Sequence, residues 1–327
     1  MIRPRVLRRR LNDGQHRLPL VGFGCWRINH DRVWSLGSWL FNDDNRAARV
    51  IYEAIKLGYR YIDGAYFYNI EKAIGYALRR AFADGLVKRE QMFITTKVWN
   101  NFHSRDRVIE NLKISLRELG LSYVDMALIH WPTGFSNGDN VFPMYCNLSN
   151  IPRDWEPNSY LETWAGMEDA LQLGLTKTIG VANFNIKQLQ TLLQNSNIKP
   201  VVNQVECNPY YNQIKMLEFC KNNSILMTAY SPLRQGYDLL EEQQLREIAG
   251  NHNKTVAQVA LRWNIQRGVA VIPKTVNPIH MRQNIYIFDF NLTDQEMQII
   301  DGLKQRPKLL TLGTARSHPD YPFTDGV

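Results

Sequence analysis

Short apolar runs alternate with longer segments of helical periodicity eight times along the 327 residues of the chain. Runs that are short and almost continuously apolar are typical of strands buried on both faces of a sheet. The predicted strands are residues 19–22, 61–63, 92–96, 124–130, 177–181, 201–206, 225–229 and 269–272. Strand–helix units repeated in this way predict an α/β fold in which parallel strands close into a (β/α)8 barrel. Single barrels reach this length, so we expect one domain over residues 1–327.

Helical periodicity fills the gaps between these strands. The predicted helices are residues 47–57, 71–83, 105–119, 161–173, 186–194, 214–222, 244–251 and 279–287. Two further helical patterns, residues 256–267 and 294–303, are interpreted as additions to the eight units. An open, doubly wound sheet is the alternative, but it would bring a glycine-rich loop after its first strand, and Gly22-Phe23-Gly24 lacks the third glycine.

The amino terminus carries five arginines within ten residues, and without them the formal charge of +8 falls to +3. A transit peptide or a nucleic-acid-binding arm is one interpretation of this cluster. The turn sequence Asn12-Asp13-Gly14 follows, so we favour an N-terminal β-hairpin with arginines on its wet face and no nucleic-acid partner.

Neither a membrane anchor nor a disulfide framework is expected from the sequence. No run of 18 apolar residues occurs, and no apolar stretch follows the basic start as it would in a signal peptide. The four cysteines form no C-x-x-C pair and no zinc-site spacing. Scattered thiols suit a reducing compartment, so we expect a cytoplasmic protein.

Polar residues stand at or near the ends of seven predicted strands. In a (β/α)8 barrel the carboxyl ends of the strands and the loops after them carry the catalytic groups. The residues there are Asp63, Lys97, His130, Asn183, Gln204, Tyr230 and Lys274. Their convergence on one rim predicts an active site.

Four residues at this rim have a combined chemistry that single residues would lack. A lysine ammonium near a tyrosine hydroxyl favours the phenolate and lowers its pKa, so that Tyr68 beside Lys97 could act as a general acid. Asp63 would be the buried lysine's carboxylate, and His130 could hydrogen-bond a substrate carbonyl. The set fits proton delivery to a carbonyl oxygen while a hydride attacks the carbon. Each residue also has a plain structural interpretation, as a helix cap, a solvated loop residue or a packed histidine.

The segment Gly58-Tyr-Arg-Tyr-Ile-Asp63-Gly-Ala-Tyr-Phe-Tyr68-Asn-Ile-Glu71 resembles the first signature of the aldo-keto reductases. The spacings of 29 residues from Tyr68 to Lys97 and 33 from Lys97 to His130 are also similar to that family. Further matching motifs begin at Thr95, Leu128, Ile179, Asn203, Ala229 and Ile272, and the resemblance covers nearly the whole chain to the tail His318–Phe323. It implies a (β/α)8 barrel that reduces carbonyls with NADPH and needs no metal.

The resemblance also implies residue roles. Tyr68 would be the proton donor, with Lys97, Asp63 and His130 completing a catalytic tetrad. The residues expected to bind the cofactor are Gly24, Cys25, Trp26, Asn183, Gln204, Tyr230, Ser231, Leu233, Lys274, Thr275, His280, Gln283 and Asn284. Among these, Tyr230 would stack on the nicotinamide, and Asn183 and Gln204 would hydrogen-bond its carboxamide. The residues expected to line the substrate pocket are Trp26, Phe67, Trp99 and Trp131.

The sequence departs from the family pattern at four places, one of them a pair of residues. Ala182 stands where serine is usual, Asn208 replaces a common histidine, and the pair Asn69-Ile70 replaces an unspecified residue followed by asparagine. His280 stands where an arginine usually holds the adenosine 2′-phosphate. We therefore expect NADPH to be preferred, with NADH possible but weaker.

The substrate is less determined than the chemistry. The motifs are most similar to the aldose and xylose reductase branch, which predicts a monomeric reductase of a small-molecule aldehyde or aldose carbonyl. Alternatives are a ketone reductase for steroid-like or prostaglandin-like substrates, and a structural or regulatory barrel with vestigial activity. A long segment after Trp26 contains Trp34, Trp39 and Phe41, which form either a lid or a local aromatic cluster. Residues 133–157 are also long enough for a lid.

Overall fold

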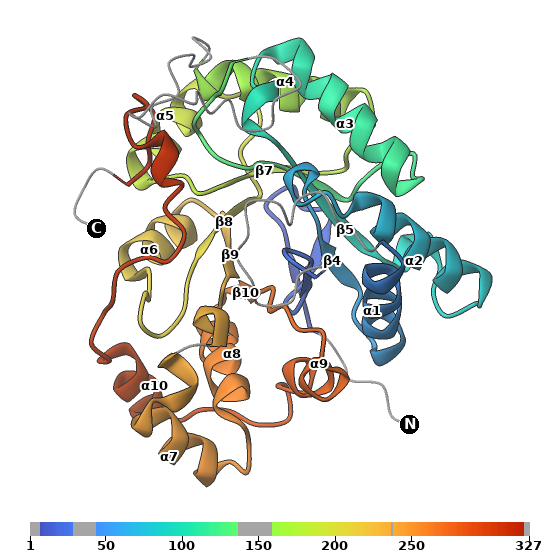
Figure 1. Cartoon of the computed structure of the whole chain (residues 1–327). Helices are drawn as coiled ribbons and strands as arrows, with labels where there is room; N and C mark the ends of the chain where they lie inside the picture. Colours follow the sequence, from blue (N-terminus) through green and yellow to red (C-terminus); the bar gives the residue numbers. More distant parts are fainter. Residues whose placement is uncertain (1–6, 29–43, 137–158, 237, 324–327) are drawn as a thin grey trace.

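The computed structural model describes residues 7–28, 44–136, 159–236 and 238–323 (Figure 1). Eight parallel strands pair with their neighbours in chain order, from β3 to β10. They are β3 (Phe23–Gly24), β4 (Tyr61–Asp63), β5 (Phe93–Val98), β6 (Met126–Ile129), β7 (Ile179–Ala182), β8 (Val202–Glu206), β9 (Leu226–Tyr230) and β10 (Ala270–Val271).

The first and last strands of this sheet meet through a parallel bridge between Val21 and Val271. The Gly22 amide donates to the Val271 carbonyl at 2.8 Å, and the Val271 amide donates to the Leu20 carbonyl at 2.9 Å. These bonds close the sheet on itself, so the predicted (β/α)8 barrel is confirmed.

The first barrel strand lies later in the chain than the sequence predicted. Residues 17–19 pair with the N-terminal strand, and the barrel strand proper is Phe23–Gly24, with the Val21 bridge between the two. The residues from Leu18 to Phe23 are all buried, so apolar character alone does not mark where the pairing partner changes.

The helices surround the barrel (Figure 1). They are α1 (Asp44–Leu57), α2 (Glu71–Ala83), α3 (Arg105–Leu119), α4 (Tyr160–Gln172), α5 (Ile186–Asn195), α6 (Ile214–Asn222), α7 (Gln243–Asn251), α8 (Val256–Gln266), α9 (Pro278–Ile285) and α10 (Asp294–Asp301). Side-chain caps begin several of them, as at Thr255 and Thr293, where reciprocal bonds to the third helical residue form a capping box. Gly120 ends α3 with a φ of 66°, a conformation that glycine adopts without strain.

The sequence assigned the wrong helix as an addition to the barrel. Helix α8, predicted as an extra element, packs against strand β10, whereas α7 packs against α8 and α10 at the periphery (Figure 1). The physical reason is burial: α8 is buried continuously from Gln258 to Ile265, while α7 buries only Leu245, Ile248 and Ala249. A helix buried almost all round lies between the sheet and an outer layer.

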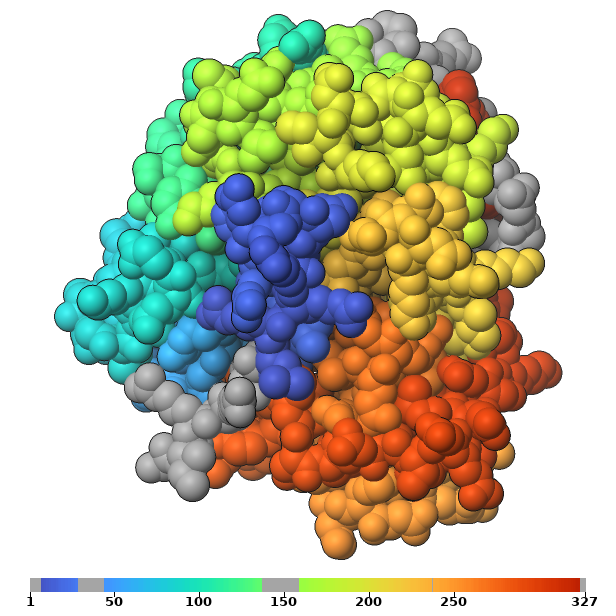
Figure 2. Space-filling view, turned by 180° about the vertical axis from the view of Figure 1, so that it is seen from behind, coloured from blue at the N-terminus to red at the C-terminus, as the bar shows by residue number. Residues whose placement is uncertain are grey.

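The N-terminal hairpin consists of β1 (Arg8–Arg10) and β2 (Arg17–Pro19), joined by residues 11–16. Arg8, Arg9 and Arg10 are exposed, so the predicted hairpin with arginines on its wet face is confirmed. The Asn12 side chain donates to the Pro200 carbonyl at 3.0 Å, just before β8. The hairpin therefore covers the amino ends of the barrel strands, and Figure 2 shows it lying across that face.

One continuous hydrophobic core joins the barrel interior to the surrounding helices, and Trp99, Trp164 and Trp263 are among its largest buried side chains. Within the described part of the chain, no helix combines the length and the apolar character that crossing a membrane would require.

Two helical glycines give a matched test of this packing. A Cβ on Gly75 in α2 would lie 2.6 Å from the Leu119 carbonyl oxygen and 2.8 Å from that of Glu118, whereas a Cβ on Gly250 in α7 would meet no atom within 4 Å. We expect Gly75→Ala to destabilise the fold by about 1–3 kcal/mol, because backbone must move. Gly250→Ala should stabilise it by up to about 1 kcal/mol. Urea unfolding followed by circular dichroism measures both, and shifts of the same sign would contradict the close contact at Gly75.

Candidate active site

A buried ion pair occupies the centre of the site. Lys97 Nζ on β5 lies 2.5 Å from Asp63 Oδ1 at the end of β4, and it also donates to the Gly64 carbonyl at 2.8 Å. Both side chains are almost fully buried. The second oxygen of Asp63 accepts bonds from Gln204 Nε2 at 2.8 Å and from the Tyr61 hydroxyl at 3.1 Å. The charges are therefore paired and hydrogen-bonded, as buried charges must be.

Tyr68 follows β4 in a short 3-10 turn (Tyr66–Tyr68) that Asn69 ends in the left-handed conformation, with a φ of 49°. Its ring centroid lies 4.9 Å from Lys97 Nζ. Burial raises the pKa of Tyr68, while the charge of Lys97 and a hydrogen bond to it pull that pKa down. The effect expected of Lys97 is present, but burial outweighs it, so the net pKa lies above the ordinary value.

Lys97 stays an ammonium in this surrounding. Burial by itself would lower the pKa of Lys97, but Asp63 and Tyr68 outweigh it and raise that pKa above its ordinary value. Tyr68 therefore faces a permanent positive charge over the whole neutral range.

His130 directly follows β6, and its ring meets those of Tyr68 and Trp99 edge to face, at centroid distances of 5.4 Å and 5.1 Å. Burial, and then the charge of Lys97, lower the pKa of His130 well below its usual range. The imidazole is thus neutral and keeps one N–H to donate. Its Nδ1 has no hydrogen-bond partner among the described residues. A phenol and a neutral imidazole side by side can hydrogen-bond one carbonyl oxygen.

Aromatic side chains surround this cluster. Phe67 stacks on Trp99, with centroids 3.8 Å apart and an interplanar angle of 12°. Trp131 meets Phe323 of the C-terminal segment edge to face at 6.0 Å, and Trp26 is half-buried after β3. Phe67 and Trp99 therefore lie with His130. Trp34, Trp39 and Phe41, for which a lid and a local aromatic cluster are the alternatives, lie outside the described residues. The same is true of residues 137–157 of the second long segment.

Two of the residues expected at the nicotinamide are joined to each other. The Tyr230 hydroxyl donates to Asn183 Oδ1 at 2.8 Å, and Asn183 Nδ2 donates to the His130 carbonyl at 3.0 Å. Gln204 lies in the same barrel interior but gives its amide to Asp63. Ser231 and Leu233 follow Tyr230 in a turn where Ser231 has a φ of 45°. The structure thus groups Asn183 and Tyr230, with Gln204 bound to the buried ion pair.

The residues expected at the adenosine end lie on and before α9. Lys274 and His280 are exposed, and Thr275 Oγ1 accepts a bond from the Asn277 amide at 3.1 Å. The Asn277 side chain caps α9 by accepting from Ile279 at 2.9 Å. An exposed lysine beside a helix N-terminus suits an anionic group.

Arg282 and its neighbours lie further along α9. The Arg282 guanidinium lies 5.5 Å from the centroid of the Tyr286 ring. Gln283 is partly buried, and Asn284 is buried. Arg282 is therefore held against Tyr286 by a contact of its own.

Gly24 and Cys25 connect the catalytic end of the site, at Asp63, with the segment expected at the adenosine end of the cofactor. The Gly24 amide donates to the Pro273 carbonyl at 3.1 Å, and the Cys25 amide donates to the Asp63 carbonyl at 3.0 Å. The thiol of Cys25 is buried, and burial raises its pKa well above the ordinary range. β3 therefore lies between Asp63 and the segment that carries Lys274.

Three ionisable residues of this region were not selected from the sequence. Glu71 begins α2 and accepts a hydrogen bond from the Thr96 hydroxyl. Glu206 ends β8, and its carboxylate lies 3.7 Å from Lys308 Nζ. Glu206 shares a strand face with Gln204, two residues earlier, and that spacing could have identified it. Lys308 lies in an irregular segment whose sequence carries no periodic signal.

A surface pocket of about 480 Å³ lies away from this cluster, lined in part by Asn12, Lys177 and Lys199. Asn12 belongs to the N-terminal hairpin, so this pocket is at the amino end of the barrel, opposite the rim that carries Tyr68 and His130.

Comparisons with known proteins agree with this barrel fold. The family model described as "Aldo/keto reductase family" matches residues 21–305. "Aldo-keto reductase family 1 member C15" of Rattus norvegicus is 40% identical over 328 residues, 97% of each chain. "Aldose reductase B" of Dictyostelium discoideum is 42% identical over 307 residues, 92% of this chain and 94% of its own. A solved aldo-keto reductase of Bombyx mori in complex with NADP is 36% identical, with a TM-score of 0.86, and covers 97% of this chain and 99% of its own. The chain belongs to the aldo/keto reductase family of oxidoreductases.

Glu71 provides a test of the site's electrostatics. Burial raises its pKa from an ordinary 4.5 to about 7, against the hydrogen bond from Thr96 that lowers it. Between these two pH values the folded state holds a proton that the unfolded state has released, so stability falls as pH rises from about 4.5 to 7.

We expect Glu71→Gln to remove this dependence and to stabilise the protein above pH 7 by about 3 kcal/mol, at 1.36 kcal/mol per pKa unit. Urea unfolding of the variant and wild type at pH 5 and pH 8 gives the difference. The exposed Glu90→Gln variant is the matched control. A Glu71→Gln gain that is equal at both pH values would contradict the raised pKa.

Proposed function

We propose that this protein reduces the carbonyl group of an aldehyde or aldose to an alcohol, with NADPH as the reductant. The observation that carries the proposal is the convergence of Tyr68, Lys97, Asp63 and His130 in one buried cluster at the carboxyl end of the barrel. Family membership and the names of relatives such as aldose reductase B support the same activity.

In this proposal Tyr68 is the proton donor. The Lys97 ammonium favours the phenolate that remains after proton transfer, so it stabilises the charge that develops during the reaction. Asp63 keeps Lys97 charged, which burial alone would oppose. His130, neutral at every physiological pH, donates its N–H to the same carbonyl oxygen and so orients the substrate.

The residues at the rim have the chemistry to bind nicotinamide adenine dinucleotide phosphate. Asn183 and Tyr230 offer an amide and an aromatic face beside His130, and Lys274 and Thr275 offer a cation and a hydroxyl at the N-terminus of α9. When bound, the nicotinamide supplies a hydride to the carbonyl carbon. The proposed cofactor site is completed by Gly24, Cys25, Trp26, Gln204, Ser231, Leu233, Gln283 and Asn284. Of these, Gln204 donates a hydrogen bond to Asp63.

The aromatic side chains favour flat or apolar aldehydes and sugar faces. Phe67 and Trp99 present a stacked pair next to His130, and Trp26 and Trp131 complete the proposed pocket. Ketones of steroid-like or prostaglandin-like shape are the competing substrates, and a panel scored by kcat/KM separates the two classes. A barrel with only vestigial activity would turn over neither class.

We further propose that residues 1–327 act as one domain, as a monomer and in the cytoplasm. The free, buried state of Cys25, Cys207 and Cys220 among the described residues supports a reducing compartment.

The Tyr68→Phe variant tests the proton donor. Loss of the hydroxyl should lower kcat by about 10²–10⁴-fold, the usual contribution of general acid catalysis, while the Kd for NADPH stays within about threefold. Stopped-flow turnover of an aromatic aldehyde and fluorescence titration of the cofactor measure the two quantities. The exposed Tyr76→Phe variant on α2 is the control, and a Tyr68→Phe enzyme with more than a tenth of the wild-type kcat would overturn this role.

His280→Arg tests cofactor choice. Arginine brings a permanent charge and a two-pronged donor to an exposed position of α9, whereas neutral histidine donates one hydrogen bond. The variant should bind NADPH about 5–30-fold more tightly, equivalent to about 1–2 kcal/mol, near the lower end of the range for hydrogen bonds to charged groups. NADH lacks the 2′-phosphate and serves as the internal control. An equal gain for both cofactors would mean that position 280 does not face the phosphate.

A further inference from the structure

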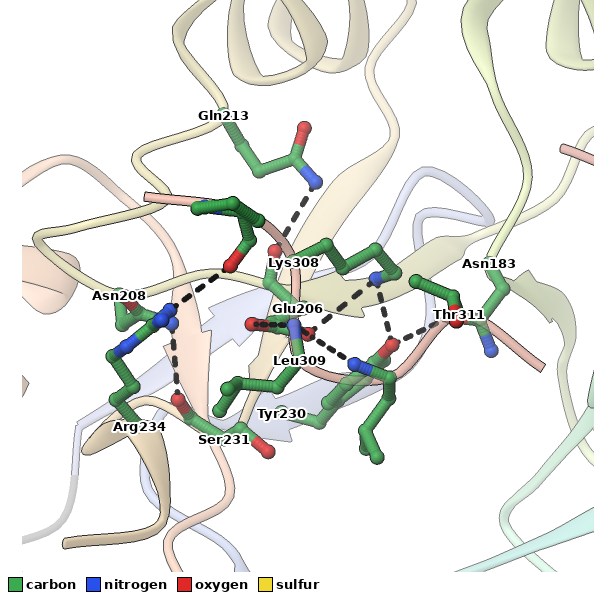
Figure 3. Close-up of polar contacts among 12 residues, drawn as sticks. Asn183, Glu206, Asn208, Gln213, Tyr230, Ser231, Arg234, Lys308, Leu309 and Thr311 are labelled. Atoms are coloured by element: carbon green, nitrogen blue, oxygen red, sulfur yellow. Dashed lines mark hydrogen bonds and ion pairs between the residues drawn. The ribbon is translucent and has the colours of Figure 1, made fainter. Parts of the chain in front are cut away.

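The C-terminal segment brings a buried lysine to the residues proposed to hold the nicotinamide (Figure 3). Lys308 Nζ donates to the Tyr230 hydroxyl at 2.8 Å and lies 3.7 Å from Glu206 Oε2. The Lys308 and Glu206 side chains are 2% and 0% exposed. Lys308 belongs to no helix or strand, so this contact is formed entirely by tertiary structure.

The backbone on both sides of Lys308 is fixed. The amides of Leu309 and Leu310 donate to the Glu206 carboxylate at 3.0–3.1 Å, and Arg234 Nη1 donates to the Pro307 carbonyl at 3.2 Å. Figure 3 shows the segment passing directly over the end of β8 and Tyr230. These bonds hold the Lys308 backbone in place, so its side chain reaches Tyr230 from a fixed position.

A chain of three hydrogen bonds links Lys308 to the His130 carbonyl through Tyr230 and Asn183, and in each bond the donor is the residue nearer to Lys308. Burial lowers the pKa of Lys308 to about 8, against the opposing effect of Glu206, so the side chain is an ammonium at pH 7. An ammonium can only donate, and a carbonyl oxygen can only accept. Because Lys308 donates to the Tyr230 oxygen, the hydroxyl proton of Tyr230 must point to Asn183 Oδ1. Asn183 Nδ2 then donates to the His130 carbonyl at the other end, which fixes which way the Asn183 amide faces.

This order leaves a defined donor at the rim. An asparagine amide carries two N–H groups, and the His130 carbonyl takes one of them. The Asn183 oxygen already accepts from Tyr230, so the second N–H is the group left to bind a ligand. A carboxamide oxygen is an acceptor that fits it.

We propose that Lys308 is a positioning residue that holds the Tyr230 ring and, through the Tyr230 hydroxyl, the position of the Asn183 amide that receives the carboxamide of the cofactor. The inference rests on the proposed function, because it assumes that the nicotinamide lies against Tyr230 and Asn183. Lys308 touches neither reactant and acts through Tyr230.

The test measures cofactor affinity in Lys308→Met, which has a side chain of similar length without a donor. Without the ammonium, the Tyr230 hydroxyl loses one of the two hydrogen bonds that hold it, so the Tyr230 ring and the Asn183 side chain bonded to it are placed less firmly. The Kd for NADPH should rise by about tenfold, the loss of about one hydrogen bond. The Kd for NADH should rise by the same factor, because the two cofactors share the nicotinamide end. Lys308→Arg, again a donor only, should stay within about threefold of wild type, and the exposed Lys304→Met on the same segment should match wild type.

A double-mutant cycle separates positioning from a purely structural contribution. In a Tyr230→Phe background the hydroxyl that connects Lys308 to Asn183 is absent, so Lys308→Met should change the Kd by less than about twofold. A full tenfold effect in that background would overturn the proposal, as would a Lys308→Met variant that binds like wild type.

If Lys308→Met gives no folded protein, Lys308→Gln, which can accept as well as donate, carries the same expectations. A wild-type protein that binds no NADPH would instead overturn the proposed function, whereas normal wild-type turnover with an inert Lys308→Met would overturn only this inference.

Discussion

The buried ion pair between Asp63 and Lys97 is the interaction on which the rest of the site depends. Two opposite charges removed from water cost several kcal/mol unless further hydrogen bonds complete their surroundings. Here Gly64, Gln204 and Tyr61 complete them, and Gln204 belongs to β8, a strand that is not a neighbour of β4 or β5. Only a closed barrel brings these strands together. The pair therefore uses the fold's closure to hold a charge beside Tyr68.

A second buried pair, Glu206 with Lys308, ties the C-terminal segment to the same rim. The tail continues past it, where Gln188 donates to the Asp320 carbonyl at 2.8 Å and Asn185 donates to the Pro322 carbonyl at 3.1 Å. These two side chains also form the capping box of α5. One helix N-terminus thus anchors the chain that places Phe323 against Trp131 and Lys308 against Tyr230.

Burial and the charge of Lys97 together set the pKa values of Tyr68 and His130. Burial raises the pKa of Tyr68 and lowers that of His130, and Lys97 lowers both. For His130 the two effects act in the same direction and both lower the pKa, so the imidazole is neutral. For Tyr68 the two effects oppose each other, so the phenol remains protonated and able to donate until a reaction draws on Lys97.

The sequence by itself determined the order of elements and the identity of the polar rim, because strand burial and helical periodicity are local and Asp63, Lys97 and His130 stand at predicted strand ends. It placed α2, α3 and α6 at their observed boundaries. It misplaced the first barrel strand and chose α8 rather than α7 as the added helix, because both depend on which distant element covers an apolar run. The bonds of Gln204 to Asp63 and of Lys308 to Tyr230 span 141 and 78 residues. Such contacts are decided only when the barrel closes and the irregular C-terminal segment crosses its rim, since no local pattern encodes where a loop will deliver its side chain.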